Sequence, residues 1–125
     1  MAGMTLDAGG LIAVDRNDRR MLVLLARVQE TGARVTVPAT ALAQAVRQPE
    51  RQARLSRLVR QPNTDVVALD RVDATNIGRL LAASGRTDIV DAHVVICARR
   101  TRQSVVTSDA DDLRALDPSI KLVEI

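Results

Sequence analysis

Apolar and polar positions follow two different periods along this chain. Short β-branched runs that alternate with period two, such as the run at residues 34–37, are typical of strands. Longer segments with apolar residues three and four apart are typical of helices, and Asp18 and Gly32 mark the start and the end of one of them. The pattern predicts strands at residues 4–6, 34–37, 65–69, 104–107 and 121–125, and helices at residues 9–15, 19–30, 38–47, 50–60, 70–84, 88–103 and 110–116.

The order of these elements predicts the fold class. Strands separated by helices favour a parallel sheet with helices on both faces. We therefore expect an α/β fold, a three-layer α/β/α sandwich with a central parallel sheet, formed by residues 1–125 as a single domain. The strand at residues 65–69 is mostly apolar and is expected to be buried. In such sheets ligands bind beyond the carboxyl ends of the strands, near the point where the strand order reverses.

Composition excludes several classes of function. The chain has no Phe, Tyr or Trp, which excludes an RNA-binding domain that stacks bases on aromatic rings. Its single cysteine is taken to exclude both a disulfide framework and a thiolate zinc site. The longest apolar runs are far shorter than the ~20 residues that a membrane span needs, so we expect no membrane association and a cytoplasmic location.

The positive charge is carried almost entirely by arginine. There are 17 Arg and one Lys, and the net charge is +3. Guanidinium groups bind phosphate in a bidentate manner, so RNA is a plausible partner; an ordinary solvated surface and a GC-rich codon bias are the alternatives. Arg47 and Arg51 would form one helical stripe with Arg54, provided that Pro49 does not rotate the register, and Arg16 lies close in sequence to Asp7.

Aspartates follow the ends of predicted strands. Asp7 ends the first strand, Asp109 directly follows the strand at residues 104–107, and Asp91 lies near the start of the long helix at residues 88–103. If the sheet winds as expected, these three side chains converge at one edge. Three carboxylates in one place repel one another unless a cation neutralises them, and oxygen ligands favour Mg²⁺ or Mn²⁺. Such an ion can activate water for the cleavage of a phosphodiester bond.

Each of these acids also has a simpler interpretation. Asp7, Asp88 and Asp109 are well placed to cap helices, and Asp112 is a typical first-turn charge. Asp91 is different, because it lies within an apolar segment where an acid is costly without a partner. Two further residues are expected to be structural: His93 points about 200° away from Asp91 around the helix, and Cys97 is expected to be a small buried side chain.

Three short motifs resemble those of a known family. The segment at residues 6–13 resembles the opening of PIN domains, residues 87–92 resemble their Asp-Ala motif at the start of a late helix, and residues 106–113 resemble their Thr-x-Asp strand end. Their order and spacing, and the length of the chain, are similar to those of VapC-like toxins. The resemblance covers essentially the whole chain.

This resemblance implies a Mg²⁺- or Mn²⁺-dependent endoribonuclease that is the toxin of a toxin–antitoxin pair, forms a homodimer and is inhibited by its cognate antitoxin. It implies that Asp7, Asp91 and Asp109 are catalytic metal ligands, with Asp112 as an auxiliary acid. Asp88, on the same first turn as Asp91, is also expected as an auxiliary residue.

The chain departs from the family pattern at one position. Gln44 stands where the family has a second acid, a Glu, on the helix after strand two. Gln44 is either an uncharged ligand at the site or an ordinary polar helix residue. A second interpretation is therefore a catalytically weak PIN-fold module that binds RNA or a partner protein. A phospho-receiver domain ranks third, because Asp7 has no adjacent acid and the helix with Asp88 and Asp91 has no role there.

Overall fold

A parallel sheet of five strands forms the centre of the computed structural model, which describes residues 3–125. The strand order is β3-β2-β1-β4-β5, so β1 is central and the switch point lies between β1 and β4. All four strand pairings within the described residues are parallel. The strands are β1 (Met4–Leu6), β2 (Val35–Pro38), β3 (Thr64–Val67), β4 (Ser104–Thr107) and β5 (Leu122–Glu124).

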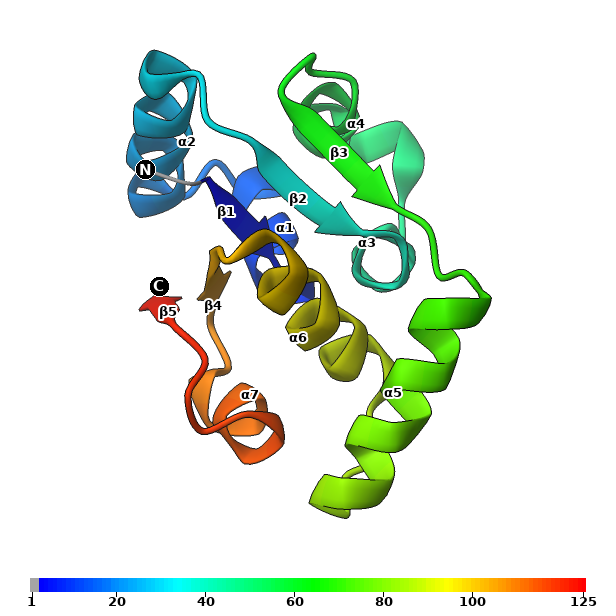
Figure 1. Cartoon of the computed structure of the whole chain (residues 1–125). Coiled ribbons are helices and arrows are strands. Elements are labelled where there is room, and N and C mark those ends of the chain that lie inside the picture. Colours follow the sequence, from blue (N-terminus) through cyan, green and yellow to red (C-terminus); the bar gives the residue numbers. More distant parts are fainter. Residues whose placement is uncertain (1–2) are drawn as a thin grey trace.

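Helices cover both faces of this sheet (Figure 1). One face carries α6, which packs against β1, β2 and β4, while α1 packs against β1 and β4 from behind the sheet. This confirms the predicted three-layer α/β/α sandwich. The helices are α1 (Ala8–Asp15), α2 (Arg19–Thr31), α3 (Ala39–Ala45), α4 (Ala53–Val59), α5 (Arg71–Ser84), α6 (Ile89–Thr101) and α7 (Ala110–Leu116), with a 3-10 turn η1 (Pro49–Arg51) between α3 and α4.

Aspartate caps and glycine stops fix several helix boundaries as the sequence predicted. The side chains of Asp18, Asp70 and Asp88 each accept a hydrogen bond from the backbone N–H three residues later, at 3.0, 2.8 and 3.0 Å. Gly32 and Gly85 follow α2 and α5 with φ angles of 68° and 71°, a left-handed conformation that glycine adopts without strain.

The prediction of a buried third strand is wrong. β3 lies at the edge of the sheet and pairs with β2 alone, and Asp65 and Val66 are exposed. Arg34 and Asp65 form an ion pair at 2.6 Å across these two strands. An apolar run does not by itself distinguish a central strand from an edge strand, because that depends on which strands pair.

The helices predicted at residues 38–47 and 50–60 are shorter than expected. In the loop between α3 and α4, Gln52 accepts hydrogen bonds from the backbone N–H groups of Arg47 and Gln48 and donates one to the Ala45 carbonyl. This side chain satisfies backbone groups that a continuous helix would otherwise pair. The prediction that Arg47 and Arg51 share one helical stripe with Arg54 is therefore wrong.

The core lies on both sides of β1. Leu6 and Leu11 are fully buried, and so are side chains from β2, β4 and α6. The largest fully buried apolar side chains are Met4, Leu6, Leu11, Met21, Leu55, Leu113, Val28, Val35, Val37, Val94 and Val95. One polar residue, His93, is buried among them without exposed surface. No helix within residues 3–125 has the length and apolar character needed to span a membrane.

Gly10 allows α1 to begin close to the end of β4. A Cβ added at Gly10 would lie 2.9 Å from the Val106 carbonyl oxygen, whereas one added at Gly78 in α5 would meet nothing within 4 Å. We expect Gly10→Ala to lower the free energy of unfolding by about 1–3 kcal/mol through overpacking. Gly78→Ala is the matched control and is expected to raise it by about 0.5–1 kcal/mol. Urea unfolding measures both, and equal midpoints for the two variants would contradict this packing.

Candidate metal-binding carboxylate site

Asp7 and Asp109 leave the sheet at the same edge. They follow β1 and β4, which are paired with Leu6 opposite Val106. Asp7 is buried and caps α1, with its Oδ1 accepting a hydrogen bond from the Gly10 N–H at 2.8 Å. The two carboxylates therefore flank the switch point between β1 and β4, which is where ligands bind in sheets of this kind.

Thr107 connects these two aspartates. Its hydroxyl accepts a hydrogen bond from the Asp109 N–H at 2.8 Å and also hydrogen-bonds to the Asp7 carboxylate. Asp109 occupies the capping position of α7, but its side chain makes no capping hydrogen bond. The carboxyl group is instead directed to the Asp112 side chain. The interpretation of Asp109 as a simple helix cap is therefore corrected.

Asp91 is the residue that brings the aspartates into one site. It lies in the first turn of α6, and its backbone N–H is capped by Asp88. Burial is the largest cause that raises the pKa of Asp91 to about 6, followed by the negative charges of neighbouring carboxylates. These neighbours are Asp88, Asp7, Asp112 and Asp109. The four aspartates that the sequence proposed beside Asp91 are therefore near enough for their charges to act on it.

The other two principal acids also resist ionisation. Burial raises the pKa of Asp7, although hydrogen bonds from Thr107 and Gly10 act in the opposite direction. The pKa of Asp109 is raised first by its hydrogen bond with Asp112, then by burial and by the charges of nearby aspartates. A group of acids that raise one another's pKa is an environment that a cation would stabilise.

Arg86 is a site neighbour that the sequence reasoning missed. Its guanidinium forms an ion pair with Asp112 at 2.9 Å, with both side chains about half exposed. Thr107 was missed as well, although it stands within the Thr-x-Asp motif itself. The available signals were the position of Arg86 two residues before Asp88 and the hydroxyl at the end of a buried strand.

The remaining predicted residues lie on the surface. Gln44 is exposed on α3, and its side chain makes no hydrogen bond with any residue of the described range 3–125. Arg16 follows α1 and Arg51 ends η1, both exposed. Arg47 donates hydrogen bonds to the carbonyls of Ala43 and Val46 at 2.8 Å. Roles for Gln44 and these arginines remain predictions.

The donor set of this site fits Mg²⁺ or Mn²⁺. Asp7, Asp91 and Asp109 offer carboxylate oxygens, the ligands that hard divalent ions prefer. Within the described residues, the group whose ligand atoms all lie within 4.8 Å of one another is a different one, formed by the buried side chains of Asp73, His93 and Cys97. The two groups differ because the first has oxygen donors alone.

The raised pKa of Asp91 predicts a pH-dependent stability difference. A carboxyl that binds its proton more tightly in the folded state stabilises the fold below about pH 4, and this contribution is lost as the pH rises through about 6. Without metal, we expect the free energy of unfolding of Asp91→Asn to equal that of the wild type near pH 4. Near pH 7 we expect it to be higher by about 1–2 kcal/mol, a figure reduced for solvent screening.

Urea unfolding of both proteins between about pH 4 and pH 7 measures this difference. The comparison cancels the opposite effect of His93, whose pKa is lowered by burial in both proteins. A difference that does not change with pH would contradict the electrostatic description of Asp91.

Comparisons with known proteins relate the chain to solved structures by fold. No family model and no curated protein matches it. It is similar to a chain of VapBC2 from Rickettsia felis bound to a DNA fragment from its promoter, with a TM-score of 0.68 and 13% identity over 98% of each chain. For FitAcB from Neisseria gonorrhoeae the TM-score is 0.66 and the identity 16%, over 97% of this chain and 96% of that chain. For a chain of FitAB bound to an IR36 DNA fragment, the TM-score is 0.66 and the sequence identity is 13%, over 97% of this chain and 94% of that chain.

These comparisons correct the identification as a VapC-like PIN toxin. That assignment is wrong at the level of the sequence family, because no family model matches and the structural neighbours share only 13–16% identity. Its motifs were short, and Asp7 and Asp88 within them also serve as ordinary helix caps. The comparisons support an α/β fold like that of chains in the VapBC2 and FitAB structures, which is consistent with a PIN-like three-layer sandwich.

Proposed function

We propose that this protein is a divalent-metal-dependent endoribonuclease that acts as the toxin of a toxin–antitoxin pair. The observation that supports the proposal is that Asp7 and Asp109 follow two paired strands at the switch point of the sheet, and that burial and neighbouring carboxylates, these two among them, raise the pKa of Asp91 to about 6. Such perturbed carboxylates at a ligand-binding edge are typical of functional sites.

Asp7, Asp91 and Asp109 are the residues that would hold Mg²⁺ or Mn²⁺. When bound, the ion would supply Lewis-acid stabilisation of charge on the phosphate and a more acidic water. Thr107 fixes the positions of Asp7 and Asp109 through its hydroxyl group. Asp112, hydrogen-bonded to Asp109 and paired with Arg86, is placed to accept a proton next to the ligands, and Asp88 orients the first turn that carries Asp91.

The partners of this proposal are an RNA, an antitoxin protein and a second copy of the chain. Arg16, Arg47 and Arg51 are exposed cations available to RNA phosphates, and the net charge of +3 favours a polyanion. The fold shared with toxin–antitoxin complexes supports an antitoxin partner. Exposed apolar side chains at Val66, Leu69 and Val72, along β3 and the start of α5, support self-association.

The test is RNA cleavage by the purified protein with Mn²⁺ or Mg²⁺, with and without a chelator. We expect metal-dependent cleavage by the wild type, which Asp109→Asn loses, and tighter metal binding in Gln44→Glu if residue 44 faces the site. Absence of cleavage together with absence of metal binding in a folded wild-type protein would overturn the proposal.

A binding module is the second candidate, and the exposed, uncharged Gln44 favours it. With an amide in place of a glutamate at residue 44, a metal at the site would be bound less tightly, because each added negative charge strengthens the attraction to a cation. This candidate predicts RNA or antitoxin binding by the wild type without cleavage, and cleavage that appears in Gln44→Glu.

A further inference from the structure

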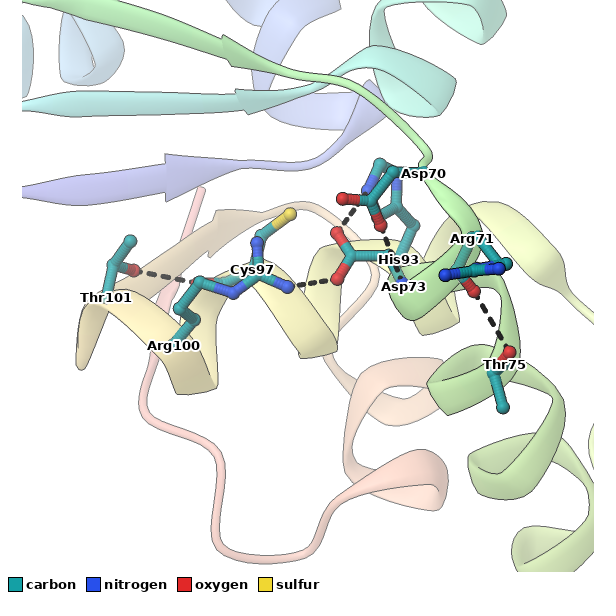
Figure 2. Close-up of polar contacts among 8 residues, drawn as sticks. All are labelled: Asp70, Arg71, Asp73, Thr75, His93, Cys97, Arg100 and Thr101. Atoms are coloured by element: carbon teal, nitrogen blue, oxygen red, sulfur yellow. Dashed lines mark hydrogen bonds and ion pairs between the residues drawn. The ribbon is translucent and has the colours of Figure 1, made fainter.

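A group of buried polar side chains lies between α5 and α6, formed by residues other than the aspartates of the carboxylate site. Asp73 comes from α5, and His93 and Cys97 come from α6 (Figure 2). All three are at most 1% exposed, and one ligand atom of each lies within 4.8 Å of the others. The carboxylate, imidazole and thiol therefore share one enclosed position.

Two atoms in this group have no hydrogen-bond partner within the described part of the chain. They are Nε2 of His93 and Oδ2 of Asp73, and they face each other at 3.6 Å, which is too long for a hydrogen bond. The other nitrogen of His93, Nδ1, hydrogen-bonds to the Thr40 hydroxyl at 2.7 Å. If Nδ1–H donates to Thr40, the Nε2 lone pair is directed at a carboxylate oxygen, and two such acceptors attract a cation between them.

We propose that Asp73, His93 and Cys97 form a binding site for a Zn²⁺-class metal ion, separate from the carboxylate site. A tetrahedral zinc ion with Zn–N and Zn–O bonds of about 2.0–2.1 Å holds those two atoms about 3.4 Å apart. The observed separation of Asp73 Oδ2 and His93 Nε2 is 3.6 Å, so these two ligands are already close to position. Cys97 stands one helical turn after His93 and on the same face of α6.

The donor set distinguishes this site from a magnesium site. Thiolate and imidazole suit Zn²⁺ and similar ions, whereas Mg²⁺ prefers oxygen alone. Binding replaces the thiol proton of Cys97 with the metal and releases that proton to solvent, so the thiolate and the Asp73 carboxylate balance the two charges of the ion. The fourth tetrahedral position is left for a water molecule or a small anion.

Neighbouring residues already orient the ligands as metal sites require. Arg100 forms an ion pair with Oδ1 of Asp73, and Oδ2 faces Nε2 of His93, as Figure 2 shows. Thr40 from α3 fixes the imidazole of His93. Ligating histidines and carboxylates are commonly held by such second partners. The expectation that one cysteine excludes a thiolate zinc site does not hold for a mixed set, in which a carboxylate and an imidazole supply the other ligands.

Cobalt is the probe that tests this site. A Co²⁺–thiolate bond gives an intense near-ultraviolet absorption band, and a chain without Phe, Tyr or Trp has almost no background there. We expect the folded wild type to develop this band with one equivalent of Co²⁺, and Zn²⁺ to abolish it stoichiometrically. The band is expected to be absent in Cys97→Ser and retained in Asp91→Asn, which changes only the carboxylate site.

Affinity separates a three-residue site from binding to a single thiol. Loss of a group that only orients a ligand lowers metal affinity by about 10–100-fold, which is the loss we expect for Thr40→Val. Asp73 is itself a ligand, so we expect Asp73→Asn to lower metal affinity by at least about 100-fold. Thr40→Ser keeps the hydroxyl and is the matched control. Absence of the band in the folded wild type would overturn the proposal, and so would unchanged affinity in Asp73→Asn. Neither outcome depends on RNA cleavage, so this site and the proposed nuclease fail independently.

Discussion

Asp91→Asn is expected to lose at least about 100-fold of the Mn²⁺- or Mg²⁺-dependent RNA cleavage. The physical reason is that Asp91 lies among four other carboxylates. Its burial and their negative charges oppose the ionisation of Asp91 more clearly than that of any other member of the group. Its ionised form becomes favourable when a cation is bound, and an uncharged amide offers the ion much less. Removal of residues that only support a metal ligand already costs about 10–100-fold, and loss of a ligand costs more.

The measurement is cleavage of a labelled RNA together with calorimetric titration of the metal. Asp111→Asn is the matched control: Asp111 lies in the first turn of α7, as Asp91 lies in the first turn of α6, but its side chain is 99% exposed. We expect this control to keep its cleavage rate within about a factor of three, because charges exposed to water are well screened. Since Asp91→Asn is also expected to fold more stably near pH 7, lost cleavage could not be attributed to unfolding. Equal metal affinity in Asp91→Asn and wild type would contradict the site.

The sequence predicted those parts of the fold that depend on neighbours along the chain. Asp18 and Asp88 cap helices through the N–H three residues away, and Gly85 ends one, so a short window contains the whole interaction. The carboxylate edge was also predictable, because the carboxyl ends of parallel strands meet at one edge whatever the strand order. Asp7 and Asp109 follow two such ends.

Features that depend on residues far apart in the sequence were not predictable. The exposure of β3 follows from its position at the edge of the sheet, where it pairs with β2 alone. The buried group between α5 and α6 joins Asp73 to His93, which lie 20 positions apart. The only local signal was the four-residue spacing of His93 and Cys97 on one helix face.

Arg100→Ala is expected to lower the free energy of unfolding by about 2–4 kcal/mol in metal-free buffer. Asp73 is 1% exposed, and Arg100 is the one side chain that donates a hydrogen bond to its carboxylate within residues 3–125. Removing one partner of such a pair leaves a buried charge without compensation, which typically costs about 3–5 kcal/mol. The expected loss lies below this typical range because the Arg100 side chain is half exposed, so water could enter the space that it leaves.

Arg99→Ala is the matched control for this prediction, since both arginines lie in the last turn of α6 and each pairs with a buried aspartate. Asp117, the partner of Arg99, also accepts hydrogen bonds from the N–H and the hydroxyl of Ser119, at 3.0 and 2.7 Å. Its carboxylate therefore stays satisfied, and we expect Arg99→Ala to cost less than about 1 kcal/mol. Urea unfolding with a chelator measures both variants.

Adding Asp73→Asn to Arg100→Ala should recover part of the loss, because the amide carries no charge and can donate to Nε2 of His93. Equal losses in the two single variants would mean that Asp73 does not depend on Arg100.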